Sequence, residues 1–249
     1  MPRPNRQISA TGYYHIIIRG VGKQILFEET GDNVKFLHLL RENLPAFQIT
    51  CAAYCLMDNH VHLLLHDPGS HLPRFMQTVS SAYARFFNFK YERSGHLFQG
   101  RYFSVAIESE LQLLAVFRYI LQNPERAGMG AAYSYKWSSY RDYGKKGGIA
   151  DTAAIAELLG DVSSYRLFIQ VECAGEEHVH YKDEGEMPGA HTNTVFREVL
   201  GTTDGTVLQR WNRPDRNKAV RALKRKGLSI RTIERRTGIS RGIIQNIKT

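Results

Sequence analysis

The sequence predicts an α+β fold in which a ferredoxin-like antiparallel sheet carries helices on one face, followed by a small all-α domain toward the C-terminus. Strand and helix patterns follow one another in the order β-α-β-β-α-β-α over the first 123 residues. Beyond residue 150 the strand patterns stop and short helical patterns take over. With 249 residues, of which 43% are hydrophobic, the chain is long enough for one ordinary domain and a smaller one.

Four segments show strand patterns. The first, Tyr13–Arg19, is rich in β-forming residues and stops at a glycine. The second and third, residues 48–56 and His60–His66, flank a short polar link, which is typical of a tight hairpin. The fourth, residues 102–107, alternates in polarity like an edge strand.

Three further segments show the spacing of apolar residues that an amphipathic helix requires. They span residues 32–44, 72–91 and 109–123. We expect the first to end before Pro45 and the last to end at Pro124, because proline lacks the backbone N–H that continues a helix. Together with the strands, these helices complete the ferredoxin-like order with one added helix.

The formal net charge of +9 is unevenly distributed along the chain. Residues 1–150 contain 17 basic and 11 acidic side chains, residues 151–208 contain 3 and 11, and residues 209–249 contain 13 and 2. These changes predict a first domain over residues 1–147, an acidic helical middle region with a linker over 148–208, and a basic helical domain over 209–249. A basic tail of this kind is typical of a surface that neutralises phosphates; a solvated helix face is the alternative.

The middle region has only local features. Two short amphipathic helices, residues 151–159 and 163–171, precede an acidic link that runs to about residue 190. Helical turns are expected at residues 194–200 and 204–211. We assign this region no chemistry. Its acidity disfavours direct contact with nucleic acid, and a spacer or a cover for the basic part is the expected role.

Composition excludes several classes of protein. No apolar run approaches the roughly 20 residues that a membrane-spanning helix needs, and the first residues lack an apolar signal core. We therefore expect a soluble, cytoplasmic protein with no membrane partner. The three cysteines are too few and too irregularly spaced for a disulfide framework or a cysteine zinc site.

The strongest chemical signal is a pair of histidines on the third predicted strand. Because strand side chains alternate between faces, His60 and His62 project from one face, close enough to bind one cation. Histidines in strands are also often merely hydrogen-bonded, so the spacing alone is weak. A second pair, His178 and His180, repeats the spacing in the acidic link, where no apolar strand surrounds it.

The last helix of the first domain carries a second signal. Tyr119 and Asn123 are four residues apart and lie on one helix face, so a phenolic oxygen and an amide oxygen can address the same point. Taken alone, Tyr119 is better explained as a core residue and Asn123 as a residue that ends the helix before Pro124. The pair therefore supports a site only in combination with the histidines.

Four motifs in a fixed order give the sequence a family resemblance. They are YHIIIRG at residues 14–20, MDNHVHL at 57–63, LFQGRY at 97–102 and RYILQNPERAG at 118–128. The combination resembles the HUH-type single-tyrosine transposases, and most closely the branch called REP-associated tyrosine transposases. The similarity covers roughly residues 9–143, and the motifs are specific as a set although none is specific alone.

The resemblance implies an HUH nuclease fold for the first domain and assigns roles to the two signals. It implies that His60, His62 and Asn123 hold a divalent cation, Mg²⁺ or Mn²⁺, and that Tyr119 is the nucleophile. Many insertion-sequence members use glutamine as the third ligand, so Asn123 is a departure with a shorter reach. The adjacent Gln122 does not share the helix face of Tyr119. Ligand chemistry alone would also permit zinc.

Basic residues of the first domain are expected to contact DNA phosphates rather than to perform chemistry. They are Arg85, Lys90, Arg93, Arg101, Arg118 and Arg126. Two further histidines, His15 and His66, are candidates to support the metal-binding pair, and the sequence does not choose between them.

The basic C-terminal part predicts a helix-turn-helix. Helices are expected at residues 215–226, 230–237 and 240–248. Residues on the last helix are expected to face base edges, and three arginines on the preceding helix are expected to hold the DNA backbone. The former are Arg241, Gln245 and Asn246, and the latter are Arg231, Arg235 and Arg236. A basic three-helix bundle that docks on the rest of the protein is the alternative.

The resemblance predicts a metal-dependent endonuclease and strand transferase that nicks and rejoins single-stranded DNA through a 5′-phosphotyrosine, at hairpin or palindromic repeats. The C-terminal module would select duplex DNA. One alternative is a domesticated regulator that reads hairpin DNA without catalysis. Another is a hydrolytic metallophosphoesterase, in which water makes Tyr119 dispensable. Both a monomer and a homodimer are compatible with the sequence.

Overall fold

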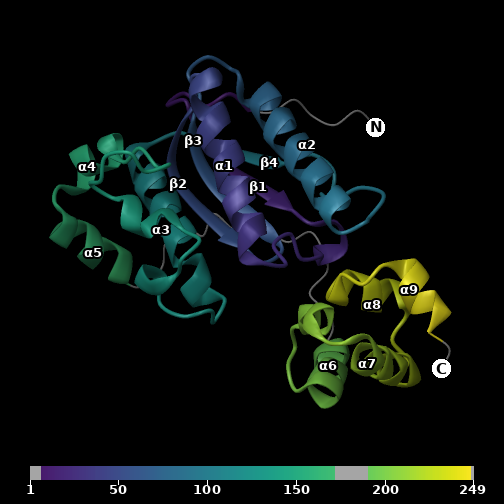
Figure 1. Cartoon of the computed structure of the whole chain (residues 1–249). Coiled ribbons are helices and arrows are strands. Elements are labelled where there is room, and N and C mark those ends of the chain that lie inside the picture. The colour runs from purple at the N-terminus through teal and green to yellow at the C-terminus, as the bar shows by residue number, and fades with distance from the viewer. Residues whose placement is uncertain (1–6, 172–189, 248–249) are drawn as a thin grey trace. The chain divides into compact units, whose positions relative to one another are not determined.

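The computed structural model describes residues 7–171 and 190–247 (Figure 1). These residues form two compact units. The first contains residues 7–18 and 27–171, and the second contains Arg19–Leu26 together with residues 190–247. The acidic link with His178 and His180 lies outside the described residues.

The first unit is built on a four-stranded sheet. Its strands are β1 (Tyr13–Arg19), β2 (Thr50–Met57), β3 (His60–His66) and β4 (Phe103–Ile107). Their order across the sheet is β2-β3-β1-β4, with antiparallel pairing of β2 with β3 and of β1 with β4. This is the strand order of a ferredoxin-like sheet, so the predicted α+β fold class is confirmed. The order also makes β1 and β3 neighbours.

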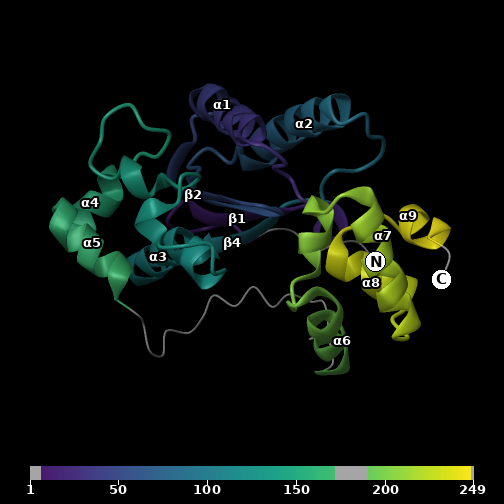
Figure 2. The ribbon, with the colours of Figure 1, turned by 60° about the horizontal axis from the view of Figure 1, so that its bottom comes forward.

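Helices cover both faces of this sheet. Figure 2 shows α1 (Thr30–Ala46) and α2 (Leu72–Lys90) over one face and α3 (Glu110–Arg126) on the opposite face. The structure differs here from the predicted single covered face. The reason is that β2 and β3 are apolar on both sides, and side chains such as Ala53, Cys55 and Leu64 are buried in the core that packs on α3.

Two helices continue past a proline, so their predicted ends are wrong. Pro45 lies inside α1 and Pro124 lies inside α3, each within the last turn. The fixed φ of proline suits a helix, and near the C-terminal end its missing N–H removes only one hydrogen bond. Asn123 therefore lies within helical backbone and keeps a helical relation to Tyr119.

Two short helices complete the first unit. They are α4 (Ala153–Leu159) and α5 (Val162–Gln170), and they follow the 3₁₀ turns η2 (Ala132–Ser134) and η3 (Ser139–Asp142). Tyr165 of α5 is buried against Phe117 of α3, with the ring centroids 6.1 Å apart. Because α5 buries its apolar side on α3, the first unit extends beyond the predicted boundary at residue 147.

The second unit is helical. Its elements are η1 (Val21–Lys23), α6 (Ala190–Leu200), η4 (Gly205–Arg210), α7 (Arg213–Arg225), α8 (Ile230–Thr237) and α9 (Arg241–Asn246). Its core contains Phe196, Leu208, Val220, Ile233 and Ile244. The Gln209 side chain donates to the carbonyl of Thr237 and accepts from the backbone N–H of Ile25. The three C-terminal helices lie close to their predicted limits, within a unit larger than residues 209–249. Among the described helices of either unit, none is long and apolar enough to cross a membrane.

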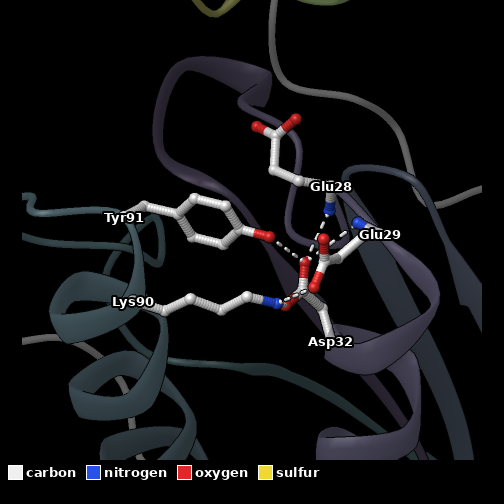
Figure 3. A network of polar contacts seen from close by, with 5 residues as sticks. All are labelled: Glu28, Glu29, Asp32, Lys90 and Tyr91. Atoms are coloured by element: carbon white, nitrogen blue, oxygen red, sulfur yellow. Dashed lines mark hydrogen bonds and ion pairs between the residues drawn. The ribbon is translucent and has the colours of Figure 1, made fainter.

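A buried carboxylate connects the start of α1 to the end of α2 (Figure 3). Asp32 is 0% exposed, and its carboxylate accepts hydrogen bonds from the backbone N–H groups of Glu28 and Glu29. It also accepts from the Tyr91 hydroxyl at 2.7 Å and pairs with Lys90 Nζ at 2.5 Å. Burial and the bond to the Asp32 carboxylate raise the pKa of Tyr91 to about 12. Lys90, which was predicted to contact DNA, is thus engaged in an ion pair with Asp32, although its side chain remains partly exposed.

Candidate active site

Two neighbouring strands bring three histidines to the sheet face that α3 covers. His60 and His62 on β3 project from the same face, as their spacing predicts, with ring centroids 4.8 Å apart and planes at 84°. His15 on β1 stacks on His62, with a centroid distance of 5.2 Å. The sheet order explains this contact, because β1 and β3 are adjacent.

Each histidine of the pair has a hydrogen-bond partner at Nδ1. Nδ1 of His62 lies 3.0 Å from Nε2 of His15, and Nδ1 of His60 lies 2.7 Å from Oδ1 of Asn59. Histidines that bind metals commonly engage their second ring nitrogen in this way, which fixes the tautomer and the ring orientation. With Nδ1 engaged, Nε2 is the nitrogen through which each ring would bind a cation.

His15 is the member of this group that the sequence left undecided. It is 1% exposed, and burial lowers its pKa to about 4, so the ring is neutral at neutral pH. Among the described residues, its Nδ1 has no hydrogen-bond partner. In the ferredoxin-like order β1 lies beside β3, and this is the feature that brings His15, rather than His66, to the histidine pair. His66 instead packs against the ring of Tyr13, at 4.5 Å.

Tyr119 meets the histidines from α3. Its ring lies edge-on to His62, with centroids 5.6 Å apart, and edge-on to His15, at 5.9 Å. Tyr119 is partly exposed, and the guanidinium of Arg126 lies 5.3 Å from its ring centroid. The aromatic ring of Tyr119, two imidazoles of the neighbouring strands and a guanidinium therefore lie close together, and the Tyr119 ring also packs on the core of the first unit. The assignment of Tyr119 as a nucleophile stays a prediction.

Asn123 lies one helical turn after Tyr119 and is 9% exposed. Its Nδ2 donates to the backbone carbonyl of Tyr119 at 2.9 Å, which commits the amide nitrogen to the helix. Oδ1 is consequently the atom of this side chain that could serve a cation. Gln122 is directed elsewhere, because it donates to the carbonyl of Ile169 on α5 and accepts from Arg126.

The donor set fits a divalent cation of borderline character. No group of three His, Cys, Asp or Glu side chains arranged for a metal occurs within residues 7–171 and 190–247. The candidate set is instead two imidazoles and one amide oxygen, His60, His62 and Asn123. Three protein ligands leave coordination positions for substrate oxygens. Mixed nitrogen and oxygen donors suit Mn²⁺ or zinc better than Mg²⁺.

The predicted DNA-contacting residues of the first unit fall into two groups. Four of them are exposed, namely Arg85, Arg93, Arg101 and Arg126. Two are engaged within the fold. Arg118 is only 6% exposed and lies over the Phe168 ring at 4.4 Å, and Lys90 pairs with Asp32. These placements argue against DNA contacts for Arg118 and Lys90, since each packs against its own unit.

The predicted DNA-reading residues of the second unit also differ among themselves. Arg241, Gln245 and Asn246 are exposed on or beside α9. Arg236 donates to the carbonyl of Thr203 and lies 5.1 Å from the Phe196 ring, so it packs inside its unit. Arg231 and Arg235 lie on α8.

The fold and the site together define a ferredoxin-like domain that carries a histidine pair and a tyrosine on one sheet face. Residues 9–123 match the model of the family described as "Transposase IS200 like". The predicted resemblance to the single-tyrosine transposases is therefore confirmed over these residues, and it supports a transposase-like function. The match ends at Asn123, before η2, α4 and α5.

Two solved structures are similar to the chain. One, described as the REP-associated tyrosine transposase bound to a REP hairpin, is 14% identical, covers 62% of this chain and 96% of its own, and has a TM-score of 0.48. The other, a protein of Deinococcus radiodurans R1 described as a transposase, is 24% identical, covers 48% of this chain and 95% of its own, and has a TM-score of 0.33. Among proteins with curated descriptions, none matches the chain.

Proposed function

We propose that the protein is a metal-dependent single-strand DNA endonuclease and strand transferase that nicks and rejoins DNA through a 5′-phosphotyrosine. The contact of the Tyr119 ring with His62, at 5.6 Å, carries this proposal. It joins the proposed nucleophile to a proposed metal ligand from a segment more than 50 residues away in the sequence.

The chemistry explains why these groups belong together. The Tyr119 hydroxyl would attack the scissile phosphorus and form a tyrosyl P–O bond, while the bond from phosphorus to the 3′ oxygen breaks. The phenolic proton leaves, and the 3′ oxygen takes up a proton to become a free hydroxyl. Because the phosphodiester energy is conserved, another 3′-hydroxyl can reverse the step and join strands without ATP or water.

A phenol is a weak nucleophile at neutral pH, and a phosphodiester repels an approaching anion. A divalent cation held by His60, His62 and Asn123 would supply charge neutralisation at the phosphate. The contribution of the protein is to hold the donors and the phenol together. Arg126, beside the Tyr119 ring, adds a fixed positive charge on the same side. One chain provides all of these groups, which supports assembly of the site within a monomer as well as within a homodimer.

His15 is a positioning residue in this proposal. Metal binding through Nε2 of His62 requires the proton of that ring on Nδ1, where it donates to Nε2 of His15. A neutral His15 can accept this bond, and its burial keeps it neutral. His15 thus selects the tautomer of His62 that can ligate a cation.

Single-stranded or hairpin DNA is the proposed substrate of the first unit. The motif resemblance and the exposed arginines, such as Arg85, Arg101 and Arg126, support this choice. The proposed role of the second unit is a helix-turn-helix that binds duplex DNA. Its support is the pair α8 and α9 joined at Gly238, which has a left-handed φ of 69°, and the exposed Arg241, Gln245 and Asn246.

The decisive experiment is a search for a covalent adduct. Purified protein is incubated with Mn²⁺ and a labelled hairpin oligonucleotide that carries single-stranded flanks, and is then denatured. A hairpin is the first probe to try because the solved transposase structure above is bound to one. We expect a denaturation-resistant protein–DNA band that is missing from Tyr119→Phe.

Each alternative has its own outcome in this experiment. An adduct that persists in Tyr119→Phe refutes the assigned nucleophile. Cleavage without an adduct indicates a hydrolase that uses water, and binding without cleavage indicates a DNA-reading regulator. Tyr119→Phe should keep the unfolding midpoint of the wild type, because the substitution removes only a hydroxyl from a partly exposed ring.

A further inference from the structure

A cavity of about 620 Å³ lies on the first unit, in the part of the chain that follows the family match. Segments from η2, η3 and α5 and the loop after η3 surround it. Its volume falls within the range of small-ligand sites, about 300–1,000 Å³. Its lining combines aromatic rings with cations, namely Tyr133, Tyr140, Tyr143, Arg141, Lys145 and Arg166.

The aromatic floor of this cavity is rigid. The rings of Tyr143 and Tyr165 stack with centroids 4.0 Å apart and planes at 4°. The Tyr165 hydroxyl donates to the carbonyl of Tyr140, and the Tyr143 hydroxyl donates to the carbonyl of Gly160. These polar ends are therefore satisfied within the protein, and the faces and edges of the rings are what the floor presents.

One aromatic ring of the lining is available at the surface. Tyr133 is 60% exposed, in contrast to Tyr140 and Tyr143, which are 8% and 5% exposed. Arg141 Nε lies 3.5 Å from the backbone carbonyl of Tyr133, which keeps a guanidinium beside the exposed ring. A planar group that entered the cavity could stack on Tyr133 while an attached anion met Arg141.

The charge of the lining is uniformly positive among the described residues. Arg141, Lys145 and Arg166 are exposed, and none of the residues that line the cavity is acidic. Three acids lie near the lining without forming part of it. Asp142 Oδ2 accepts from the N–H of Ala150, Asp161 Oδ1 accepts from the N–H of Ser164, and burial together with the charge of Glu125 raises the pKa of Tyr140.

The floor of the cavity is coupled to the helix that carries the candidate nucleophile. Tyr165 packs on Phe117 of α3, and Gln122 of α3 donates to the carbonyl of Ile169 at 2.6 Å. Phe117 points away from Tyr119 across the helix, whereas Gln122 lies one turn after Tyr119. The cavity and the candidate active site therefore both contact α3.

We propose that this cavity binds a nucleotide of single-stranded DNA, with its base stacked on Tyr133 and its phosphates held by Arg141, Lys145 and Arg166. Unpaired bases expose both faces for stacking, whereas paired bases do not, so the site selects single strands. This inference rests on the proposed function. It adds a second point of contact for the strand that flanks the cleaved phosphate, and it assigns a role to the region for which the sequence indicated none.

A binding measurement tests this proposal. The full-length Tyr119→Phe protein is titrated with fluorescent oligo(dT) of twelve nucleotides and with a duplex of the same length, at low salt and without metal. We expect Tyr133→Ala to weaken oligo(dT) binding by about tenfold and Tyr133→Phe to restore it, because stacking needs only the ring. We expect the double variant Arg141→Gln, Arg166→Gln to weaken oligo(dT) binding by about tenfold as well. Arg74→Gln removes an exposed cation from α2 and is the matched control.

Three outcomes overturn the proposal. They are oligo(dT) affinity that is unchanged in the cavity variants, equal losses in Arg74→Gln, and equal losses for the duplex. A photocrosslink provides a second measurement: oligo(dT) carrying 5-iododeoxyuridine should crosslink to Tyr133, and crosslinks confined to other residues count against the site. The adduct experiment, which uses protein that retains Tyr119, tests the catalytic proposal independently of the cavity proposal. If the adduct forms while the cavity variants bind normally, only the cavity proposal fails, and if no adduct forms while they lose binding, only the catalytic proposal fails.

Discussion

Two polar clusters of the first unit contain a tyrosine and use it differently. In the Asp32 cluster, the hydroxyl of Tyr91 and the ammonium of Lys90 both serve one buried carboxylate (Figure 3). In the histidine cluster, the ring of Tyr119 stands at the edges of His15 and His62 and remains partly exposed. The first cluster brings opposite charges together inside the fold, whereas the second places a phenol beside ligands that suit a cation.

The two clusters differ in how completely their polar atoms are hydrogen-bonded, and this difference separates a stabilising network from a candidate reactive site. The Asp32 carboxylate receives two backbone N–H groups as well as its two side-chain partners, so little is left for a ligand to satisfy. In the histidine cluster one deeply buried nitrogen, Nδ1 of His15, has no partner among the described residues. A protein tolerates such a cost most readily where function requires the arrangement.

The largest expected effect is a loss of activity when the histidine cluster is altered. His60→Ala should reduce adduct formation by about 10³-fold or more, because losing a ligand removes a charge stabilisation worth several kcal/mol. The unfolding midpoint should change little, since His60 is only partly buried at the start of β3. Adduct yield against time and denaturant unfolding are the measurements. Full activity in His60→Ala would remove this residue from the site.

Replacement of His15 should weaken the binding of the metal ion, and this effect should be smaller than the loss of activity in His60→Ala. His15→Phe keeps a buried ring but cannot accept the hydrogen bond from His62 Nδ1. We expect the affinity for Mn²⁺ to fall by about 10- to 100-fold, as for other partners that orient metal-binding histidines. Calorimetric or electron paramagnetic resonance titration measures this without any turnover. His38→Phe, at an exposed position on α1, is the control, and equal affinities in wild type and His15→Phe would show that His15 only fills space.

The smallest effect is expected in the Asp32 cluster, and it should appear in stability alone. Lys90→Ala leaves the buried Asp32 without its ammonium partner, and we expect a loss of about 1 kcal/mol in the free energy of unfolding, because the Lys90 side chain is itself partly exposed. If Lys90 is structural, the DNA affinity of Lys90→Ala should stay within about twofold of the wild-type affinity. A change of that size is about what the loss of one exposed charge produces. Arg126→Ala is the matched contrast, with lower DNA affinity and unchanged stability. A Lys90→Ala protein that is stable but binds DNA poorly would reverse the assignment.

Much of the fold was predictable because local patterns and long-range packing agree. The strand at Tyr13–Arg19 and the strand at His60–His66 were expected at their observed limits, since β-forming side chains and a short polar link mark them. The helix ends at Pro45 and Pro124 were not, because a proline in the last turn costs less than its general effect on helices suggests. The placement of α3 on the second face of the sheet was not predictable either, because it depends on the assembled sheet rather than on any local pattern.

The candidate site also has features that the sequence predicts and features that it does not. Residue spacing by itself determined that His60 and His62 share a face and that Tyr119 and Asn123 share another, because strand and helix periodicities are local properties of the backbone. Only the tertiary structure decided that these two faces meet, that His15 is the third histidine, and that Lys90 and Arg118 turn to partners inside the unit. Those outcomes depend on the lateral order of strands and on the packing of distant helices, which short-range patterns do not encode.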